Sequence, residues 1–287
     1  MCIRDRFTGA WERVSTIPIR NSEYMDTVPY VAKNESSVGS FLITADNKRI
    51  WCFNFENLNE EGIDTNPGAA LFSSYSMNDG KITDTAMFFD IPHLMMQSGL
   101  QPFPAQTGAQ LVQPGPMTHD GLMFSDADPN EGVKTLKTIE FMIDDIRDWK
   151  GRDEEGLLVE LPRSWNDDMI WWGPAGIGAA YTIERYAEQH AGPFRDGLTD
   201  KIFNGHVARI AEGSFGGFFG WPNLTLTPAG GFMGMPATGK PSDMRVIDMY
   251  RRAGDKLTEN WIFIDLLHFW YNQGVDILLR TTGIGRV

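Results

Sequence analysis

The sequence predicts an α+β protein that contains two units of the same kind. Residues 84–99 (DTAMFFDIPHLMMQSG) resemble residues 259–274 (ENWIFIDLLHFWYNQG), and Lys81 and Lys256 align at the same offset of 175 residues without a gap. An offset this long indicates a duplicated domain, because solenoid repeats have periods of about 20 to 50 residues. Within the second unit, helix-like segments come first and strand-like segments follow. This order is typical of an α+β unit.

The residues shared by the two similar segments predict a strand followed by a short capped helix. They are Thr83/Thr258, Phe88/Phe263, Asp90/Asp265, His93/His268 and Gly99/Gly274. In both segments the aspartate follows an apolar run, and the glycine follows the next apolar run. Asp is a preferred N-cap residue and Gly commonly ends a helix. We therefore interpret the repeated Asp-x-x-His pair as part of a helix-capping pattern, not as a catalytic pair.

The second unit opens with helical patterns. Asp128-Pro129 precedes an amphipathic helix over 131–149, whose apolar positions at helical spacing are Val133, Leu136, Ile139, Ile143 and Ile146. Residues 169–172 (MIWW) then predict a strand, and 173–178 (GPAGIG) predict a tight loop. A second helix is expected over about 179–191.

Strand-like runs follow and form an antiparallel meander. They are 206–212 (HVARIAE), 215–227 (FGGFFGWPNLTLT), 242–250 (SDMRVIDMY) and 256–264 (KLTENWIFI). Residues 252–255 predict the turn between the last two, and a short helix is expected over 266–273. The last two strands are apolar on both alternating faces, so both faces of the sheet should be covered. The unit's own helices can cover one face, and the sheet of the first unit can cover the other in an intramolecular pseudo-dimer.

These patterns divide the chain into four parts. Residues 1–6 (MCIRDR) resemble translated adapter sequence in metagenomic gene models and are expected to be a non-native leader. Residues 7–100 form the first unit, which is expected to be incomplete because a copy of equal length would begin before residue 1. Residues 101–130 are rich in Pro, Gly and Gln and predict a linker, and an ordered path of this linker over the sheets stays open. Residues 131–280 form the second unit.

Composition narrows the class of partner. The net charge is −13 and no Lys/Arg cluster occurs, which argues against nucleic acid or an anionic membrane and favours a small apolar ligand. No apolar run is long enough for a membrane span, so we expect a cytoplasmic protein. Cys52 is the only credible cysteine and is expected to be a buried hydrophobe. The five histidines are scattered and match no metal motif, so no metal and no cofactor are expected.

Several segments of the second unit resemble the SnoaL-like polyketide cyclases of the nuclear transport factor 2-like superfamily. The resemblance rests on residues 205–213 (GHVARIAEG), 220–241 (GWPNLTLTPAGGFMGMPATGKP) and 244–267 (MRVIDMYRRAGDKLTENWIFIDLL). It covers about 131–278 well and 40–99 more loosely. It implies cone-shaped units, each a curved antiparallel sheet closed by helices around an apolar pocket. Family members use this pocket for cofactor-free acid/base chemistry at a carbon next to a carbonyl, or to hold a ligand.

The chain departs from the family at the principal catalytic position. Ile262 in the second unit and Met87 in the first stand where the resemblance implies an acid/base aspartate. A second polar pocket position, a histidine in the cyclases, is Asp248 here. Strand alternation places Asp248 on the same face as Tyr250, and the resemblance directs this face to the pocket together with Asn260 and Ile262. Apolar neighbours should raise the pKa of such a carboxyl toward neutrality.

Asp248 is therefore the first catalytic candidate, and His206 is the second, either as its partner or as another acid/base group. In the alternative interpretation, Asp248 is a buried acid that is tied to a neighbouring strand or to an arginine such as Arg209 or Arg245 and does no chemistry, and His206 is an ordinary strand-edge histidine. The aromatic residues that can wall the pocket are Trp171, Trp172, Trp221 and Tyr250, although aromatic residues on strands more often belong to the core.

Two functions remain open at this stage. In the first, the second unit binds a small apolar carbonyl compound and catalyses proton transfer as a cofactor-independent cyclase, isomerase or lyase. In the second, the protein is a non-catalytic ligand-binding or scaffold protein whose two units pair with each other, and further homo-oligomerisation remains open.

Overall fold

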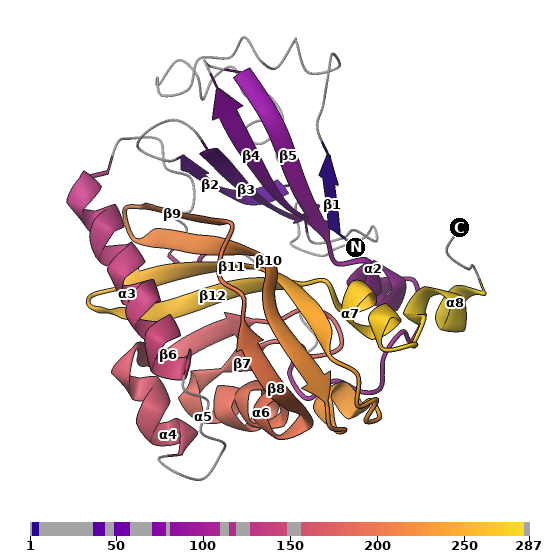
Figure 1. The fold of residues 1–287 in the computed structure, drawn as a ribbon. Coiled ribbons are helices and arrows are strands. Elements are labelled where there is room, and N and C mark those ends of the chain that lie inside the picture. Colours follow the sequence, from indigo (N-terminus) through magenta and orange to yellow (C-terminus); the bar gives the residue numbers. More distant parts are fainter. Residues whose placement is uncertain are drawn as a thin grey trace.

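The computed structural model describes the backbone of residues 2–5, 37–43, 49–57, 71–78, 81–109, 115–118, 127–147 and 156–283. Side chains are described for Phe88 and within these ranges from Asp90 onward. In this part of the chain the fold is α+β, with two separate sheets and helices beside them (Figure 1). No helix among the described residues is long and apolar enough to cross a membrane.

The first sheet is antiparallel and has the strand order β1-β5-β4-β3-β2. Its strands are β1 (Cys2–Asp5), β2 (Ser37–Ile43), β3 (Arg49–Asn57), β4 (Leu71–Asn78) and β5 (Lys81–Phe89), and helix α2 (Ile91–Gln97) follows β5. Strand β1 comes from the expected leader and pairs with β5. The assignment of residues 1–6 to a non-native leader stays a prediction.

The second unit begins with helices and closes with a large sheet. Its helical elements are α3 (Pro129–Arg147), α4 (Leu157–Glu160), η1 (Leu161–Arg163), α5 (Thr182–Tyr186), η2 (Ala187–Ala191), α6 (Gly192–Gly197), η3 (Phe232–Gly234), α7 (Leu266–Asn272) and α8 (Ile277–Thr282). Its strands are β6 (Trp165–Trp172), β7 (Ala180–Tyr181), β8 (Leu198–Phe203), β9 (Ala208–Glu212), β10 (Phe215–Pro228), β11 (Ser242–Ala253) and β12 (Lys256–Ile264).

The strand order of the second sheet is β7-β6-β12-β11-β10-β8, and β9 also pairs with β10. The predicted antiparallel meander is confirmed for β9 to β12. Strand β6 differs, because it pairs with β12 in parallel. These two strands are far apart in sequence, so no hairpin turn forces them to be antiparallel. The sheet stays open and curved, with α5 and α6 on one side of it (Figure 1).

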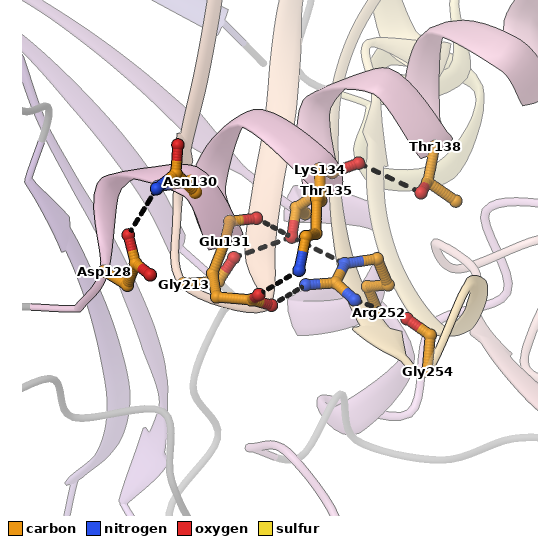
Figure 2. Close-up of polar contacts among 9 residues, drawn as sticks. All are labelled: Asp128, Asn130, Glu131, Lys134, Thr135, Thr138, Gly213, Arg252 and Gly254. Atoms are coloured by element: carbon orange, nitrogen blue, oxygen red, sulfur yellow. Dashed lines mark hydrogen bonds and ion pairs between the residues drawn. The ribbon is translucent and has the colours of Figure 1, made fainter.

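Helix α3 is fixed to the sheet by buried polar contacts at its N-terminal half (Figure 2). Arg252 of β11 is buried, and its guanidinium donates to the Glu131 carboxylate at 2.5 Å and to Thr135 Oγ1 at 2.9 Å. Thr135 Oγ1 also lies 2.6 Å from the Gly213 carbonyl oxygen. These contacts turn Thr135 toward the sheet, and Val133, which the spacing placed in the core, is consequently 52% exposed.

The two similar sequence segments have the same secondary structure at the same offset. Strand β5 and helix α2 coincide with β12 and α7 at both ends after a shift of 175 residues. The pairing of β4 with β5 changes register between Ser76 and Met77, and that of β11 with β12 changes register between Arg251 and Arg252. The same offset of 175 residues therefore relates the two strands, the helices that follow them and the two register shifts.

The predicted helix caps are confirmed in both segments. Asp90 Oδ1 accepts from the His93 amide at 2.9 Å, and Asp265 Oδ1 accepts from the His268 amide at 3.1 Å. Asp90 has a second contact, because its Oδ2 accepts from the Ala175 amide at 2.9 Å. This aspartate thus connects the end of the first unit to the loop that follows β6.

The sheet face that carries Ile247 and Phe263 belongs to an apolar cluster that includes Phe88 of β5. The Phe88 ring meets the Phe219 and Trp221 rings edge-on, with centroids 5.8 and 5.9 Å apart. This is the part of the predicted contact between the two units that involves described side chains. The complete pseudo-dimer packing stays a proposal.

Residues 101–109, at the start of the predicted linker, lie against the second unit. Phe103 is buried, and Ala109 forms a β-bridge with Ala179. Thr107 Oγ1 donates to the carbonyl oxygen of Gln189 at 2.5 Å. This segment therefore supports the loop after β6 and the turn η2, and η2 forms part of one wall of the site described next.

Candidate functional site

A cavity of about 170 Å³ lies between the second sheet and the helical elements α3, α5, η2 and α6. Its walls are mostly apolar and include Met142, Ile146, Phe194, Leu224, Met244 and Val246. The C-terminal half of α3 contributes to one wall, while the polar contacts of Figure 2 hold the N-terminal half in place. A cavity of this size and character can hold a ligand of about one substituted ring.

Asp248 lies on β11 and lines this cavity while being only 7% exposed. Asn260, on the neighbouring strand β12, donates from Nδ2 to Asp248 Oδ1 at 2.5 Å and to the Met249 carbonyl oxygen at 2.9 Å. Burial raises the pKa of Asp248 to about 7, although hydrogen bonds from Asn260 and Tyr250 partly oppose this rise. Both protonation states of this carboxyl are therefore accessible near neutral pH.

Neither arginine proposed as an alternative partner of Asp248 pairs with it among the described ion pairs. Arg209 Nη1 contacts Glu140 Oε1 at 2.8 Å. Arg245 lies 3.5 Å from the Asp243 carboxylate and 3.8 Å from the Asp265 carboxylate. Asp248 is thus held by a neutral amide, not by a cation, which leaves the effect of burial on its pKa uncompensated by a positive charge.

His206 lies in the loop between β8 and β9 and also lines the cavity. Its ring stacks on Phe218 with centroids 3.9 Å apart, and its Nδ1 accepts from Arg209 Nε at 2.9 Å. Burial, followed by the positive charge of Arg209, lowers the pKa of His206 to about 4. The imidazole is therefore neutral near pH 7, and its proton is on Nε2 because Nδ1 uses its lone pair as an acceptor.

The Nε2 atom of His206 is buried and has no hydrogen-bond partner in the described part of the structure. A side-chain hydrogen-bond interaction with Asn223 opposes the lowering of the His206 pKa, but its geometry is not that of a normal hydrogen bond, and Asn223 Oδ1 also has no partner of normal geometry among the described residues. Asn223 lies where the pairing of β10 with β11 shifts register, and such bulges redirect side chains. The cavity wall therefore presents an N–H donor and a carbonyl acceptor.

The residues expected to line the pocket divide between the two faces of the sheet. Tyr250, Asn260, Ile262 and Trp171 line the cavity together with Asp248. Trp172 does not, because alternation along β6 directs it to the opposite face, where it belongs to the cluster with Phe88.

Trp221 also lies on the opposite face of the sheet, so its expected place in the pocket is wrong. Its ring stacks on Phe219 with centroids 5.7 Å apart, and the Arg245 guanidinium lies 4.4 Å from its ring centroid. Trp221 is two residues after Phe219 on β10, so alternation along the strand places both rings on this face.

Two cavity residues, Tyr186 and His190, were missed at the sequence level. They are four residues apart in the predicted second helix, a spacing that places side chains on one helix face and could have indicated them. Burial, with the nearby Asp248 carboxyl, raises the pKa of the Tyr186 phenol above its usual range. Burial lowers the pKa of His190 to about 3, so this imidazole is neutral as well.

The family model of SnoaL-like polyketide cyclases matches residues 223–270. This segment is similar to that family, and we call it the SnoaL-like segment. The SnoaL-like segment contains Asp248, Asn260 and Ile262, whereas His190 and His206 lie outside it. The predicted resemblance to this family is confirmed over residues 223–270 of the second unit, and the tandem arrangement stays a proposal.

Solved structures similar to the chain include proteins named as SnoaL-like polyketide cyclases. One, from Jannaschia sp., has 20% sequence identity and a TM-score of 0.37, over 50% of this chain and 92% of that one. Another, from Shewanella denitrificans, has 17% identity and a TM-score of 0.37, over 51% and 98%. A nuclear transport factor 2-like protein from Burkholderia xenovorans has 16% identity and a TM-score of 0.36, over 51% and 98%. No curated protein matches the chain significantly.

Within the SnoaL-like segment, the cavity differs from the family pattern stated above, because Ile262 replaces the expected aspartate and Asp248 is its cross-strand partner. The carboxyl group is therefore on the adjacent strand. Among the described side chains, no group of three or more His, Cys, Asp or Glu residues is arranged to hold a metal ion.

Proposed function

We propose that the second unit binds a small, mostly apolar carbonyl compound and catalyses proton transfer at the carbon next to the carbonyl group, with Asp248 as the base. The observation that carries this proposal is the buried Asp248 carboxyl in an apolar cavity, with its pKa raised to about 7. A general base works best when its pKa lies close to the working pH. The reaction class is that of a cofactor-independent cyclase, isomerase or lyase.

In the first step, the Asp248 carboxylate takes the proton from the carbon. The electron pair of that C–H bond forms the C=C bond of an enolate, and the carbonyl oxygen gains negative charge. Asn260 holds the carboxylate through its hydrogen bond of 2.5 Å, so the base is oriented before the ligand arrives.

His206 supports the same step as a hydrogen-bond donor. Because its pKa is lowered to about 4, it does not act as a base near pH 7, which revises the expectation of a second acid/base group. Its Nε2–H is buried and unpartnered among the described residues, and it can donate to the enolate oxygen. A neutral imidazole polarises a carbonyl without the cost of burying a charge.

In the second step, the protonated Asp248 returns the proton. Return to the same carbon gives isotope exchange, and return to another carbon of the enolate gives an isomer. Alternatively, the enolate carbon attacks a second carbonyl group of the ligand and forms a C–C bond; the oxygen of that carbonyl becomes an alkoxide, which takes the proton from Asp248 and gives a cyclised product. Tyr186 and Tyr250 stay protonated in all these cases, because burial raises their phenol pKa values above the ordinary range.

The test uses phenylacetone as the probe and measures deuterium uptake at its CH2 group by NMR in D2O. We expect wild-type protein to accelerate uptake and Asp248→Asn to lose about 100-fold or more of that rate, the usual contribution of general base catalysis. Asp243→Asn is the matched control, because Asp243 lies on the same strand and outside the cavity. Equal rates for wild type and Asp248→Asn would exclude Asp248 as the base.

The second candidate is a non-catalytic ligand-binding or scaffold protein, and Ile262 at the expected catalytic position favours it. In this case the cavity would bind phenylacetone without accelerating isotope exchange. Saturable binding with no exchange above the buffer rate would select this candidate over the enzyme.

We also propose that residues 7–100 and 131–280 are two copies of one unit that pair within the chain. The common offset of β5 with β12 and of α2 with α7 supports this, as does the contact of Phe88 with Phe219 and Trp221. The first prediction of the Discussion tests this pairing.

A further inference from the structure

His190 is a polar side chain of the cavity that the proposed proton transfer does not use. It is 8% exposed, and its ring stacks on Trp171 with centroids 3.9 Å apart and an interplanar angle of 18°. The Tyr186 and Phe194 rings lie 5.4 and 5.5 Å from it. These contacts fix the plane of the imidazole against one wall of the cavity.

The Nδ1 atom of His190 is buried and has no hydrogen-bond partner in the described part of the chain. Leaving a buried polar atom unpaired is unfavourable, and most such atoms in folded proteins have a partner. If His190 served only as a core aromatic residue, phenylalanine would fill the same space without this cost. The unpaired nitrogen therefore indicates a ligand contact, since the residue lines the cavity.

The local backbone gives His190 an unusual position. It lies in η2, a five-residue π-helical turn between α5 and α6. Such turns widen a helix by one residue, alter the direction of its side chains and occur often at functional sites. Thr107 supports this turn from outside by donating to the Gln189 carbonyl oxygen at 2.5 Å. The π-helical turn is thus held by a segment that belongs to neither α5 nor α6.

His190 and His206 belong to different walls of the cavity. His190 comes from the helical cover and stacks on Trp171, whereas His206 comes from the loop between β8 and β9 and stacks on Phe218. One neutral imidazole on each wall suits a ligand that has two polar groups on an apolar frame.

We propose that His190 is a ligand-binding residue whose Nδ1 recognises a second oxygen-bearing group of the ligand, a hydroxyl or a carbonyl, apart from the carbonyl group that reacts. This inference rests on the proposed function, because it takes the reacting carbonyl to lie at Asp248 and His206. It narrows the ligand class to an apolar carbonyl compound with a second oxygen function. His190 then determines specificity and takes no part in the proton transfer.

The test compares phenylacetone with its three ring-hydroxylated isomers (ortho, meta and para) by titration calorimetry. A phenolic hydroxyl both donates and accepts, so it can pair with either tautomer of His190. We expect wild-type protein to bind at least one isomer about 5- to 10-fold more tightly than phenylacetone, the usual effect of one neutral hydrogen bond.

Three variants identify the source of the tighter binding of the hydroxylated isomer. His190→Phe keeps the stacked ring and should abolish the preference, whereas His190→Asn places an amide near the former Nδ1 and should retain much of it. His93→Phe is the control, because His93 lies on α2 outside the cavity, and it should leave the preference unchanged. In wild-type protein, the 15N signal of His190 Nδ1 should also shift with the preferred isomer and not with phenylacetone, which requires no folded variant.

The outcomes separate this inference from the function on which it rests. The inference is overturned if all isomers bind with affinities within about twofold of that of phenylacetone, or if His190→Phe still binds one isomer more tightly. This holds even when the rate of isotope exchange depends on Asp248. If neither phenylacetone nor any isomer binds, the proposed ligand class fails, and the inference fails with it.

Discussion

The two faces of β11 and β12 carry consecutive residues but have opposite chemistry. On one face, Ile247 and Phe263 belong to an apolar cluster that includes Phe88. On the other face, Asp248 and Asn260 lie at a cavity, joined to each other by a hydrogen bond of 2.5 Å. Ile247 is completely buried, and Asp248 beside it is 7% exposed. The faces therefore differ in chemistry and packing, not in their degree of burial.

This difference indicates which face contributes stability and which face can contribute function. A closed apolar face gains free energy from burial and from ring contacts. The cavity face includes a buried carboxyl whose pKa is raised and unpaired polar atoms on His190, His206 and Asn223, all of which cost stability. Proteins often keep such unfavourable groups at functional sites. Substitutions on the two faces should consequently have opposite effects on stability.

The largest effect is expected on the closed face. Phe88→Ala should lower the free energy of unfolding by about 3 to 5 kcal/mol, because it removes a ring that is 2% exposed and contacts Phe219 and Trp221. Denaturant unfolding measures this change. Phe141→Ala is the matched control, since Phe141 is 52% exposed on α3 and should cost no more than about 0.5 kcal/mol. A loss of less than about 1 kcal/mol in Phe88→Ala would contradict the proposed pairing of the two units.

On the cavity face, a substitution should stabilise the protein. The folded-state pKa of Asp248 is raised to about 7 from an ordinary value of 3.8, so its contribution to stability is present below about pH 4 and is lost as pH rises through 7. The free energy of unfolding of Asp248→Asn should therefore exceed that of wild type by about 2 to 4 kcal/mol at pH 8 and by almost nothing near pH 4. Thermal unfolding at both pH values tests this difference.

Asp243→Asn provides the comparison on the same strand. Burial alone would raise the pKa of Asp243, but its hydrogen bond to His268 and the nearby charges of His268 and Arg245 lower it overall. This variant should therefore lose stability at pH 8, where Asp248→Asn gains. The same sign for both variants would show that burial does not control the pKa of Asp248.

The smallest effect concerns the pH dependence of the proposed exchange reaction. The rate should rise with pH to a plateau above about 7, and no falling limb should come from His206, whose pKa of about 4 keeps it neutral over this range. Asn260→Ala removes a hydrogen bond that lowers the pKa of Asp248, so the midpoint should move upward by about one pH unit. An unchanged midpoint would mean that Asn260 does not act on the ionised carboxylate.

Local sequence patterns predicted much of the fold because they follow from short-range chemistry. The repeated Asp-x-x-His pairs were interpreted as helix caps, and the side chains of Asp90 and Asp265 accept from the amides of His93 and His268. Alternation along β11 placed Asp248 and Tyr250 on one face, and both line the cavity. Each of these predictions depends on residues within a few positions of one another.

The failures have a different origin, since they depend on distant contacts. Asn223, a cavity residue that was not predicted, lies in a register shift of β10 that depends on the pairing of this strand with β11. The rotation of α3, which exposes Val133, depends on the buried contacts that Arg252 makes across 117 and 121 residues of sequence. Residues 101–109 were predicted as the start of a linker whose packing over the sheets stayed open, and only the structure shows that Thr107 contacts the turn that holds His190.

The sequence by itself determined that the protein is α+β, where the repeated strands and helix caps lie, and that Asp248 shares one face of its strand with Tyr250. These features follow from backbone hydrogen bonding, side-chain alternation and capping, which act over a few residues. Only the tertiary structure decided that Asp248 is held by Asn260, that His206 is a neutral donor and that His190 lines the same cavity from the helical elements. The pKa and tautomer of a side chain depend on the groups that burial brings around it, and separate elements of the fold supply those groups.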